Sequence, residues 1–150
     1  MNSTLTIFES MKKMPLGRRL FSRIVCLKAP YFGTIRPLFR ELRPGFGELT
    51  MKKRRAVTNH LKSVHAIAMA NMCELIGGMV TEVSIPASMR WIPRTMMIEY
   101  LKIARTDLKA WCEITLPVQE QKQDLPVVVH VVDTAGIEVV RATISMYLSG

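Results

Sequence analysis

Three polar side chains stand out because they precede or interrupt the most apolar stretch of the chain. Asn59 precedes this stretch, His65 lies at its beginning, and Glu74 lies inside it, nine positions after His65. A carboxylate in an apolar helix needs a partner or holds a proton more readily than usual, and the second property suits a general base. The backbone N–H of Ala66, near the start of the helix, can donate to an oxyanion. Together these groups offer a base that can activate water and a donor for a developing negative charge.

The helix that carries these groups is predicted over residues 63–80, with Ser63 as its N-cap. Nearly every residue in it is apolar, and a helix that is apolar on all sides is buried on all sides. It is shorter than the roughly 20 clean apolar residues of a membrane span. We therefore expect a core helix and no membrane span.

The spacing of His65 and Glu74 places them on opposite sides of this helix, because nine residues at about 100° each amount to two and a half turns. One chain cannot easily point both into one pocket. In a twofold dimer, the helix start of one chain can face the carboxylate of the other. We therefore expect a homodimer, with the further pairing of dimers into tetramers left open.

The rest of the chain is predicted to wrap the helix with strands. Period-two alternation or β-branched runs predict strands over residues 48–58, 96–104, 108–116, 126–132 and 139–148. The strand over 48–58 is expected at a sheet edge. An α+β fold, with an antiparallel sheet around one central helix, satisfies these patterns.

The first 47 residues are predicted to be a helical extension of a single 150-residue domain, whose core is residues 48–148. Leu16, Leu20, Ile24 and Leu27 recur at helical spacing before Pro30. A second helical segment is predicted over residues 35–42, ended by Pro44-Gly45.

Positive charge is concentrated in the first part of the chain. The net charge is +9, yet residues 1–62 contain 14 basic and 3 acidic side chains, against 7 and 9 in the remainder. This imbalance is typical of a solvated helix face, or of a protein that binds a polyanion or a phosphate-bearing ligand. The basic run at residues 52–55 is interpreted as solvated or ligand-facing rather than as a targeting signal.

The three cysteines are widely spaced and match no metal-binding pattern, so no metal is expected. Cys73 and Cys112 lie inside apolar patterns and are predicted to be buried free thiols. Free thiols fit a reducing compartment, and Arg18, Arg19 and Arg23 argue against a secretory signal peptide, so a cytoplasmic location is expected.

The order of elements and the motif at the start of the helix resemble the hotdog fold, and in particular its acyl-CoA thioesterase group. The motif is Asn59, His65 six positions later, and Glu74 nine positions after that. Members of that group have His-Gly-Gly at the helix start, whereas this chain has His65-Ala66-Ile67. The surrounding segment also resembles a hotdog subgroup known as a domain of unknown function.

This resemblance implies an acyl-CoA substrate and a site built across a dimer interface. Glu74 would be the base or nucleophile, Asn59 would position water or substrate, and His65 with the Ala66 N–H would polarise the carbonyl. No cofactor is expected beyond the coenzyme A moiety of the substrate, whose phosphates are within the chemistry of Arg90, Arg94 and Arg105.

Each of these residues also has a structural interpretation. His65 can cap the helix, Asn59 can hold a turn, and Asn71 can satisfy Glu74 one turn away. Arg90, Arg94 and Arg105 can be plain surface charges.

Two other functions stay open. The missing glycines favour a non-catalytic hotdog protein that binds an acyl-CoA or lipid. The basic N-terminal part favours a protein that binds an anionic polymer or membrane surface. A nucleic-acid partner is not expected, because interleaved aromatic residues and known binding motifs are missing.

Overall fold

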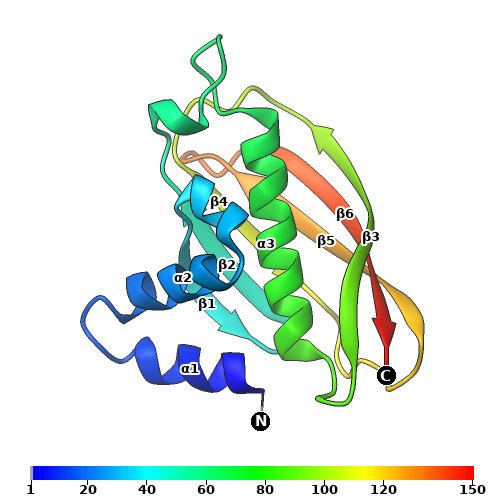
Figure 1. Ribbon diagram of the computed structural model, residues 1–150. Coiled ribbons are helices and arrows are strands. Elements are labelled where there is room, and N and C mark those ends of the chain that lie inside the picture. The colour runs from blue at the N-terminus through cyan, green and yellow to red at the C-terminus, as the bar shows by residue number, and fades with distance from the viewer. Residues whose placement is uncertain (1) are drawn as a thin grey trace.

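Helix α3 (Ala66–Ser84) lies against one face of a six-stranded antiparallel sheet and contacts every strand of it (Figure 1). This computed structural model describes residues 2–150. The strands are arranged in the order β1-β2-β4-β5-β6-β3. The expected α+β architecture is confirmed. The strands are β1 (Leu38–Arg43), β2 (Phe46–Met51), β3 (Arg90–Tyr100), β4 (Leu108–Glu113), β5 (Gln123–Val132) and β6 (Glu138–Ser149).

The sheet buries one face against α3 because its strands alternate apolar and polar residues. On β5, Val127, Val129 and Val131 are fully buried, and β4 and β6 show the same alternation. By length and composition α3 could cross a membrane, but 67% of its apolar window is buried inside the fold. Its apolar surface is therefore already used by the core.

The predicted helix over residues 35–42 is wrong, because this segment contributes strand β1. Phe39 and Leu42 are both buried although they are three residues apart. The register of β1 against β2 shifts between Phe39 and Glu41, which marks a β-bulge. The bulge adds one residue between two inward side chains, so the strand mimics helical spacing.

Three other predicted boundaries move. Strand β2 ends at Met51 instead of Thr58, and it lies inside the sheet because β1 is the edge strand. The basic run 52–55 forms a loop and the start of the 3-10 turn η2 (Arg55–Val57). Helix α3 begins at Ala66, with His65 rather than Ser63 as its N-cap, and continues through Gly77-Gly78 to Ser84. Strand β3 covers residues 90–100 instead of 96–104.

The N-terminal extension forms two helices, α1 (Ser3–Met11) and α2 (Gly17–Lys28), followed by the 3-10 helix η1 (Pro30–Ile35). They pack beside α3 near β1 (Figure 1). Phe8 of α1, Phe21 of α2 and Phe39 of β1 are buried with their rings edge to face, at centroid distances of 5.0 and 5.3 Å. This aromatic row joins the extension to the core of the same domain.

Candidate functional site

The start of helix α3 leaves the backbone N–H groups of Ala66 and Ala68 without an acceptor in residues 2–150. The Nδ1 atom of His65 accepts a hydrogen bond of 3.0 Å from the Ile67 N–H, as an N-cap does. Within residues 2–150, no acceptor takes the N–H of Ala66. Tyr100 at the end of β3 donates a hydrogen bond of 3.3 Å to the Ala66 carbonyl. Burial raises the pKa of Tyr100, so its phenol keeps the proton that it donates. The Ala66 N–H is therefore a donor held at the first position of the helix with no acceptor in residues 2–150.

Asn59 lies next to the helix start and holds a tight turn. Its side-chain oxygen accepts hydrogen bonds from the N–H groups of Leu61 and Ser63 at 2.9 and 3.2 Å, and its Nδ2 donates to the Ser63 hydroxyl at 2.9 Å. An antiparallel bridge between Thr58 and Val64 closes the turn. The turn-holding interpretation of Asn59 is thus realised. Its role in positioning water or substrate stays a prediction.

Glu74 lies about two turns further along α3 than the helix start. It is half-buried and lines a pocket between α3, the N-terminal helices and Trp91 of β3. Eight residues separate it from Ala66, or about 12 Å along the helix axis. Asn71 does not satisfy it, because the Asn71 amide instead donates to Tyr31 and Thr34 of η1 at 3.4 and 3.3 Å. Within the described chain, the Glu74 carboxylate has no hydrogen-bond or ion-pair partner.

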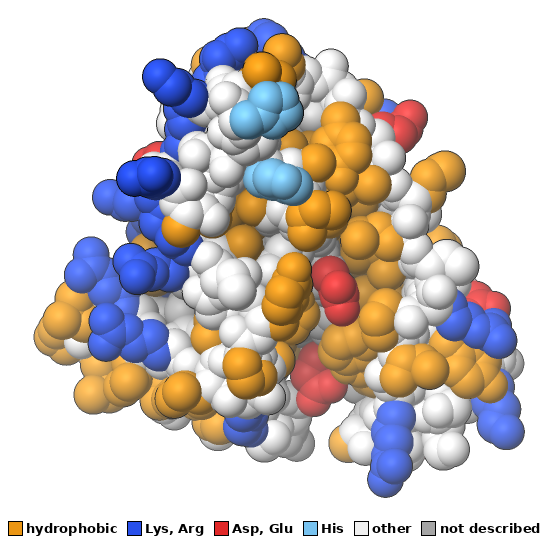
Figure 2. All heavy atoms as spheres, turned by 45° about the horizontal axis from the view of Figure 1, so that its top comes forward, with side chains coloured by type: hydrophobic (Ala, Val, Ile, Leu, Met, Phe, Trp, Pro, Cys, Tyr) orange, Lys and Arg blue, Asp and Glu red, His pale blue; other side chains and the backbone are white. Residues whose placement is uncertain are grey.

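A cationic pocket lies beside Asn59, and its location could not be predicted from the sequence. It has a volume of about 510 Å³ and is lined by Lys53, Arg54, Arg55, Thr58, Asn59 and Lys62. Burial and the nearby Arg36 guanidinium lower the pKa of Arg54, and its buried Nε has no acceptor in residues 2–150. Figure 2 shows Lys and Arg side chains gathered along one side of this face, beside hydrophobic surface that contains acidic groups. The only sequence signal was the basic run 52–55.

The three arginines predicted to meet phosphates do not form one site. Arg94 is paired with Asp124 at 2.9 Å and lies over the Tyr147 ring. Arg90 is on the same strand, ten residues from Tyr100 and therefore at the end of β3 farthest from the start of α3. Arg105 alone is near that start, because the carbonyl of its neighbour Ala104 accepts from the Val64 N–H at 2.8 Å. Because β3 is long enough to separate Arg90 and Arg94 from Arg105, the three do not meet at one place, and their contact with phosphates stays a prediction.

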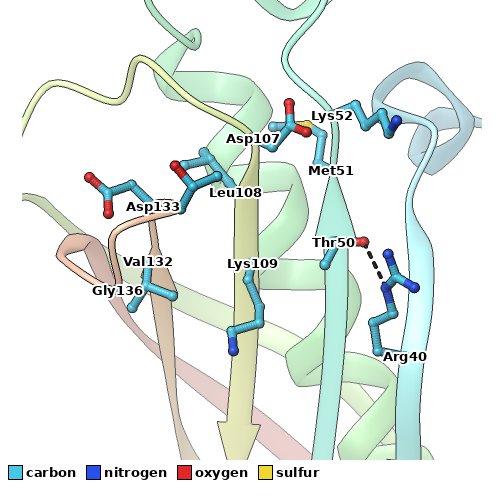
Figure 3. A pocket seen from close by; sticks show the side chains of 11 residues that line it. Arg40, Thr50, Met51, Lys52, Asp107, Leu108, Lys109, Val132, Asp133 and Gly136 are labelled. Atoms are coloured by element: carbon cyan, nitrogen blue, oxygen red, sulfur yellow. Dashed lines mark hydrogen bonds between the residues drawn. The ribbon is translucent and has the colours of Figure 1, made fainter.

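A third pocket lies at the ends of β2, β4 and β5, away from the predicted residues (Figure 3). Lys52, Asp107 and Asp133 surround it, and Arg40 donates a hydrogen bond of 3.3 Å to the Thr50 hydroxyl. Acidic and basic groups are mixed there. This pocket therefore lacks both the uniform charge and the apolar lining of the other two.

The cysteines do not contribute a nucleophile. Cys73 and Cys112 are fully buried, and burial raises the pKa of each thiol to about 12. Cys73 and Cys112 are buried free thiols, as predicted, and Cys26 is also free. A protonated, inaccessible thiol is inert, so neither Cys73 nor Cys112 is a candidate nucleophile.

A long central helix against an antiparallel sheet, with a polar motif at the helix start, defines a hotdog-fold protein. The chain belongs to the family of the domain of unknown function DUF4442, whose sequence profile matches residues 17–148. The crystal structure of a genomics target is 40% identical, with a TM-score of 0.87 and 97% of each chain covered. No curated protein sequence is significantly similar.

Two more distant structures share the fold. A Pseudomonas aeruginosa protein of unknown function, described as a probable thioesterase, is 19% identical with a TM-score of 0.78, over 90% of this chain and 95% of its own. A hypothetical thioesterase from Streptococcus pneumoniae, solved with coenzyme A, is 18% identical with a TM-score of 0.69, over 83% and 97%. The hotdog fold predicted from the sequence is confirmed.

Proposed function

We propose that this protein is a thioesterase that hydrolyses an acyl-CoA or a related acyl thioester at a site shared by two chains. The observation that carries the proposal is the arrangement on α3. An N–H at Ala66 and a carboxylate at Glu74, both without a partner in residues 2–150, lie about 12 Å apart along the helix axis. Hydrolysis needs both a base and an oxyanion donor within reach of one carbonyl. A second copy of the chain supplies the missing half.

The edge strand β3 supports this second copy. It is 11 residues long, pairs only with β6, and exposes large hydrophobic side chains, among them Ile92 and Met97 at 59% and 66%. A long, apolar, unpaired edge is a template for another strand. The occupant that we infer is β3 of an identical chain, paired antiparallel about the strand's midpoint.

Such pairing brings the two halves of the site together. Antiparallel pairing about Thr95 sets the partner's Tyr100 opposite Arg90 of this chain. In each chain Tyr100 contacts Ala66, and Trp91, next to Arg90, lines the pocket that contains Glu74. The twofold axis therefore directs the partner's Ala66 toward this chain's Glu74.

The reaction follows from these positions. Glu74 takes a proton from water, and the hydroxide oxygen attacks the thioester carbon. The partner's Ala66 N–H donates to the resulting oxyanion, and collapse of the intermediate leaves the carboxylic acid and expels the thiolate, which takes the proton from Glu74. In the alternative route the Glu74 carboxylate attacks the thioester carbon and expels the thiolate, and water then hydrolyses the mixed anhydride at the Glu74 carbonyl. Single turnover in ¹⁸O-labelled water separates the two routes, because only the second puts ¹⁶O from Glu74 into the acid.

The cationic pocket is suited to the phosphates of coenzyme A. It shares Asn59 with the turn that precedes Ala66, so a pantetheine arm leaving the carbonyl reaches it directly. Lys53, Arg55 and Lys62 make no ion pair within residues 2–150, so their charges are available to a phosphate. The coenzyme A in the pneumococcal relative supports this substrate class.

The test is release of free thiol from a panel of acyl-CoAs. We expect Glu74→Gln to lower turnover by about 100-fold or more, in the range of general-base contributions. Glu113→Gln, an exposed carboxylate at the end of β4, is the matched control and should behave as wild type. Equal background rates for wild type and Glu74→Gln on every ester would overturn the proposal.

Ala66→Pro tests the oxyanion donor without disturbing the helix. Proline is favoured at the first helical position and removes the N–H. His65 already has φ −66° and ψ 137°, the conformation that a residue before proline adopts. We expect a loss of about 100-fold or more in kcat.

Mixing the two inactive variants tests the shared site. A dimer of one Glu74→Gln chain and one Ala66→Pro chain contains one complete site. An equal mixture should therefore recover about a quarter of wild-type activity through random pairing. Recovery of no activity, with dimers present by light scattering, would show that the site is not shared.

A non-catalytic acyl-CoA-binding protein is the second candidate. The observation that favours it is the His65–Ile67 hydrogen bond, which uses the His65 side chain as a helix cap. Under this alternative, acyl-CoA is retained in native mass spectrometry and no thiol is released.

A further inference from the structure

The pocket that contains Glu74 is a slot whose wall is built by the N-terminal extension. Its volume is about 350 Å³, near the lower end of ligand pockets. Apolar side chains line it from three N-terminal elements and from the edge strand: Ile7, Phe21, Ile24, Val25, Phe32 and Trp91. An apolar slot with this lining accepts a hydrocarbon.

The two ends of the slot differ in chemistry. Glu74 marks one end, where its carboxylate is unpaired. Glu82, eight residues further along α3, marks the other end and is fully engaged. Its Oε2 accepts from the Trp91 indole N–H at 2.8 Å, and the Asn2 side chain donates to its Oε1 at 3.3 Å and to its backbone carbonyl at 2.8 Å. One end therefore borders the proposed reactive carboxylate, and a hydrogen-bonded polar plug of Glu82, Asn2 and Trp91 lies at the other.

The distance between these ends limits the ligand. Eight residues of helix rise about 12 Å. A chain whose carbonyl lies near Glu74 enters the slot and meets the plug of Glu82, Asn2 and Trp91 after that length. Burying a charged, hydrogen-bonded plug under further methylene groups would cost its hydration without replacement.

We propose that this slot holds the acyl chain of the substrate and that α1, α2 and η1 set its length, selecting a medium-length chain. This inference rests on the proposed thioesterase function for the placement of the carbonyl. It gives the N-terminal extension a role beyond adding basic residues, because the extension forms the wall of the slot and so limits the length of the bound acyl chain.

A substitution on the inner face of α2 tests the slot. Ile24 lines it, whereas Leu27, on the same helix, is 79% exposed and does not. Acetyl-, octanoyl-, dodecanoyl- and palmitoyl-CoA form the substrate panel. In wild type, kcat/KM should rise from acetyl to octanoyl and fall by palmitoyl.

Ile24→Trp should lower kcat/KM for octanoyl- and dodecanoyl-CoA by about tenfold or more, since each displaced methylene group is worth about that factor. It should leave acetyl-CoA within twofold. Leu27→Trp should keep the wild-type profile. Ile24→Ala enlarges the slot and should shift the preference toward longer chains, so the proposal stays testable if Ile24→Trp fails to fold.

Binding of non-hydrolysable thioethers separates this inference from the proposed function. S-octyl-CoA should bind wild type at least tenfold more tightly than S-methyl-CoA, and Ile24→Trp should remove the difference. If this holds without any thiol release from acyl-CoAs, the slot stands and the hydrolase proposal fails. If thiol is released but neither Ile24 variant changes chain-length preference, the slot proposal is overturned and the hydrolase proposal stands.

Discussion

The indole ring of Trp91 lies directly over Gly78, and a Cβ on this glycine would be only 2.6 Å from the indole Cη2. The lack of a Cβ at Gly78 therefore allows Trp91 of the edge strand to pack directly against α3 and to line the Glu74 slot. Trp91 is held in the same place by its hydrogen bond to Glu82. The slot thus depends on a missing side chain as well as on the apolar ones that line it.

Gly78→Ala is expected to displace the Trp91 ring and to lower the free energy of unfolding by about 1–3 kcal/mol, as overpacking does. Urea denaturation measures the change, and Trp91 fluorescence should shift to the red. Gly33→Ala is the matched control, because its Cβ would meet only the Cys26 Cβ at an ordinary 3.6 Å. Equal stability of the two variants would contradict the steric argument.

His65 variants separate capping from chemistry. His65→Ala removes the side-chain acceptor for the Ile67 N–H and should cost about 1 kcal/mol of stability. His65→Ser keeps an acceptor at the N-cap and should restore most of that loss. If His65 also polarises the substrate carbonyl, the serine variant will be stable but slow, and thiol release measured beside thermal denaturation shows this. Full activity of His65→Ser would leave His65 with a capping role alone.

The cationic pocket is expected to control the affinity for the coenzyme. Lys53→Ala with Arg55→Ala removes two charges beside Asn59 and should raise KM for acyl-CoA by tenfold or more, with kcat little changed. The effect should shrink at high salt, because screening weakens the exposed charges. Lys109→Ala, at the pocket on the ends of β2, β4 and β5, is the control. An S-acyl pantetheine, which lacks the nucleotide phosphates, should not distinguish the double variant from wild type.

The buried thiols predict both a labelling pattern and an alkaline limit of stability. At pH 8 in the native state, a thiol reagent should modify the half-buried Cys26 only, because Cys73 and Cys112 are buried and protonated. Unfolding in urea should expose all three. Rapid native labelling of Cys73 would contradict the burial that the core requires.

The alkaline limit follows from the same pKa values. Burial raises the pKa of Cys73 and of Cys112 from 9.0 to about 12, so the folded state binds more protons than the unfolded state between these values. The free energy of unfolding should therefore fall as the pH rises above 9, by up to about 1.4 kcal/mol per unit for each thiol. Denaturation curves for Cys73→Ala should show a shallower pH slope than those for wild type, whereas Cys26→Ser should change the slope little.

The pattern of apolar residues was sufficient to predict an element where a single periodicity ran through the whole segment. Alternation identified the inward faces of β4 and β6, and continuous apolarity identified α3 as the core helix. The prediction failed where a local irregularity, such as a bulge or a charged run, changed the periodicity. The β-bulge in β1 gave Phe39 and Leu42 a helical spacing, and the basic run after Met51 interrupted a strand that alternation extended to residue 58.

The sequence by itself determined the core helix, the strands that cover it, and the identities of the groups that could act on an acyl thioester, because hydrophobic periodicity and residue chemistry are local properties. Only the tertiary structure decided which of these elements and side chains lie next to one another. Packing of α1, α2 and η1 beside α3 closed a slot at Glu74, and the pairing of β3 with β6 carried Arg90 and Arg94 away from the start of α3. These are contacts between segments far apart in the chain, and packing of the whole core, rather than the spacing of residues along any one segment, sets them.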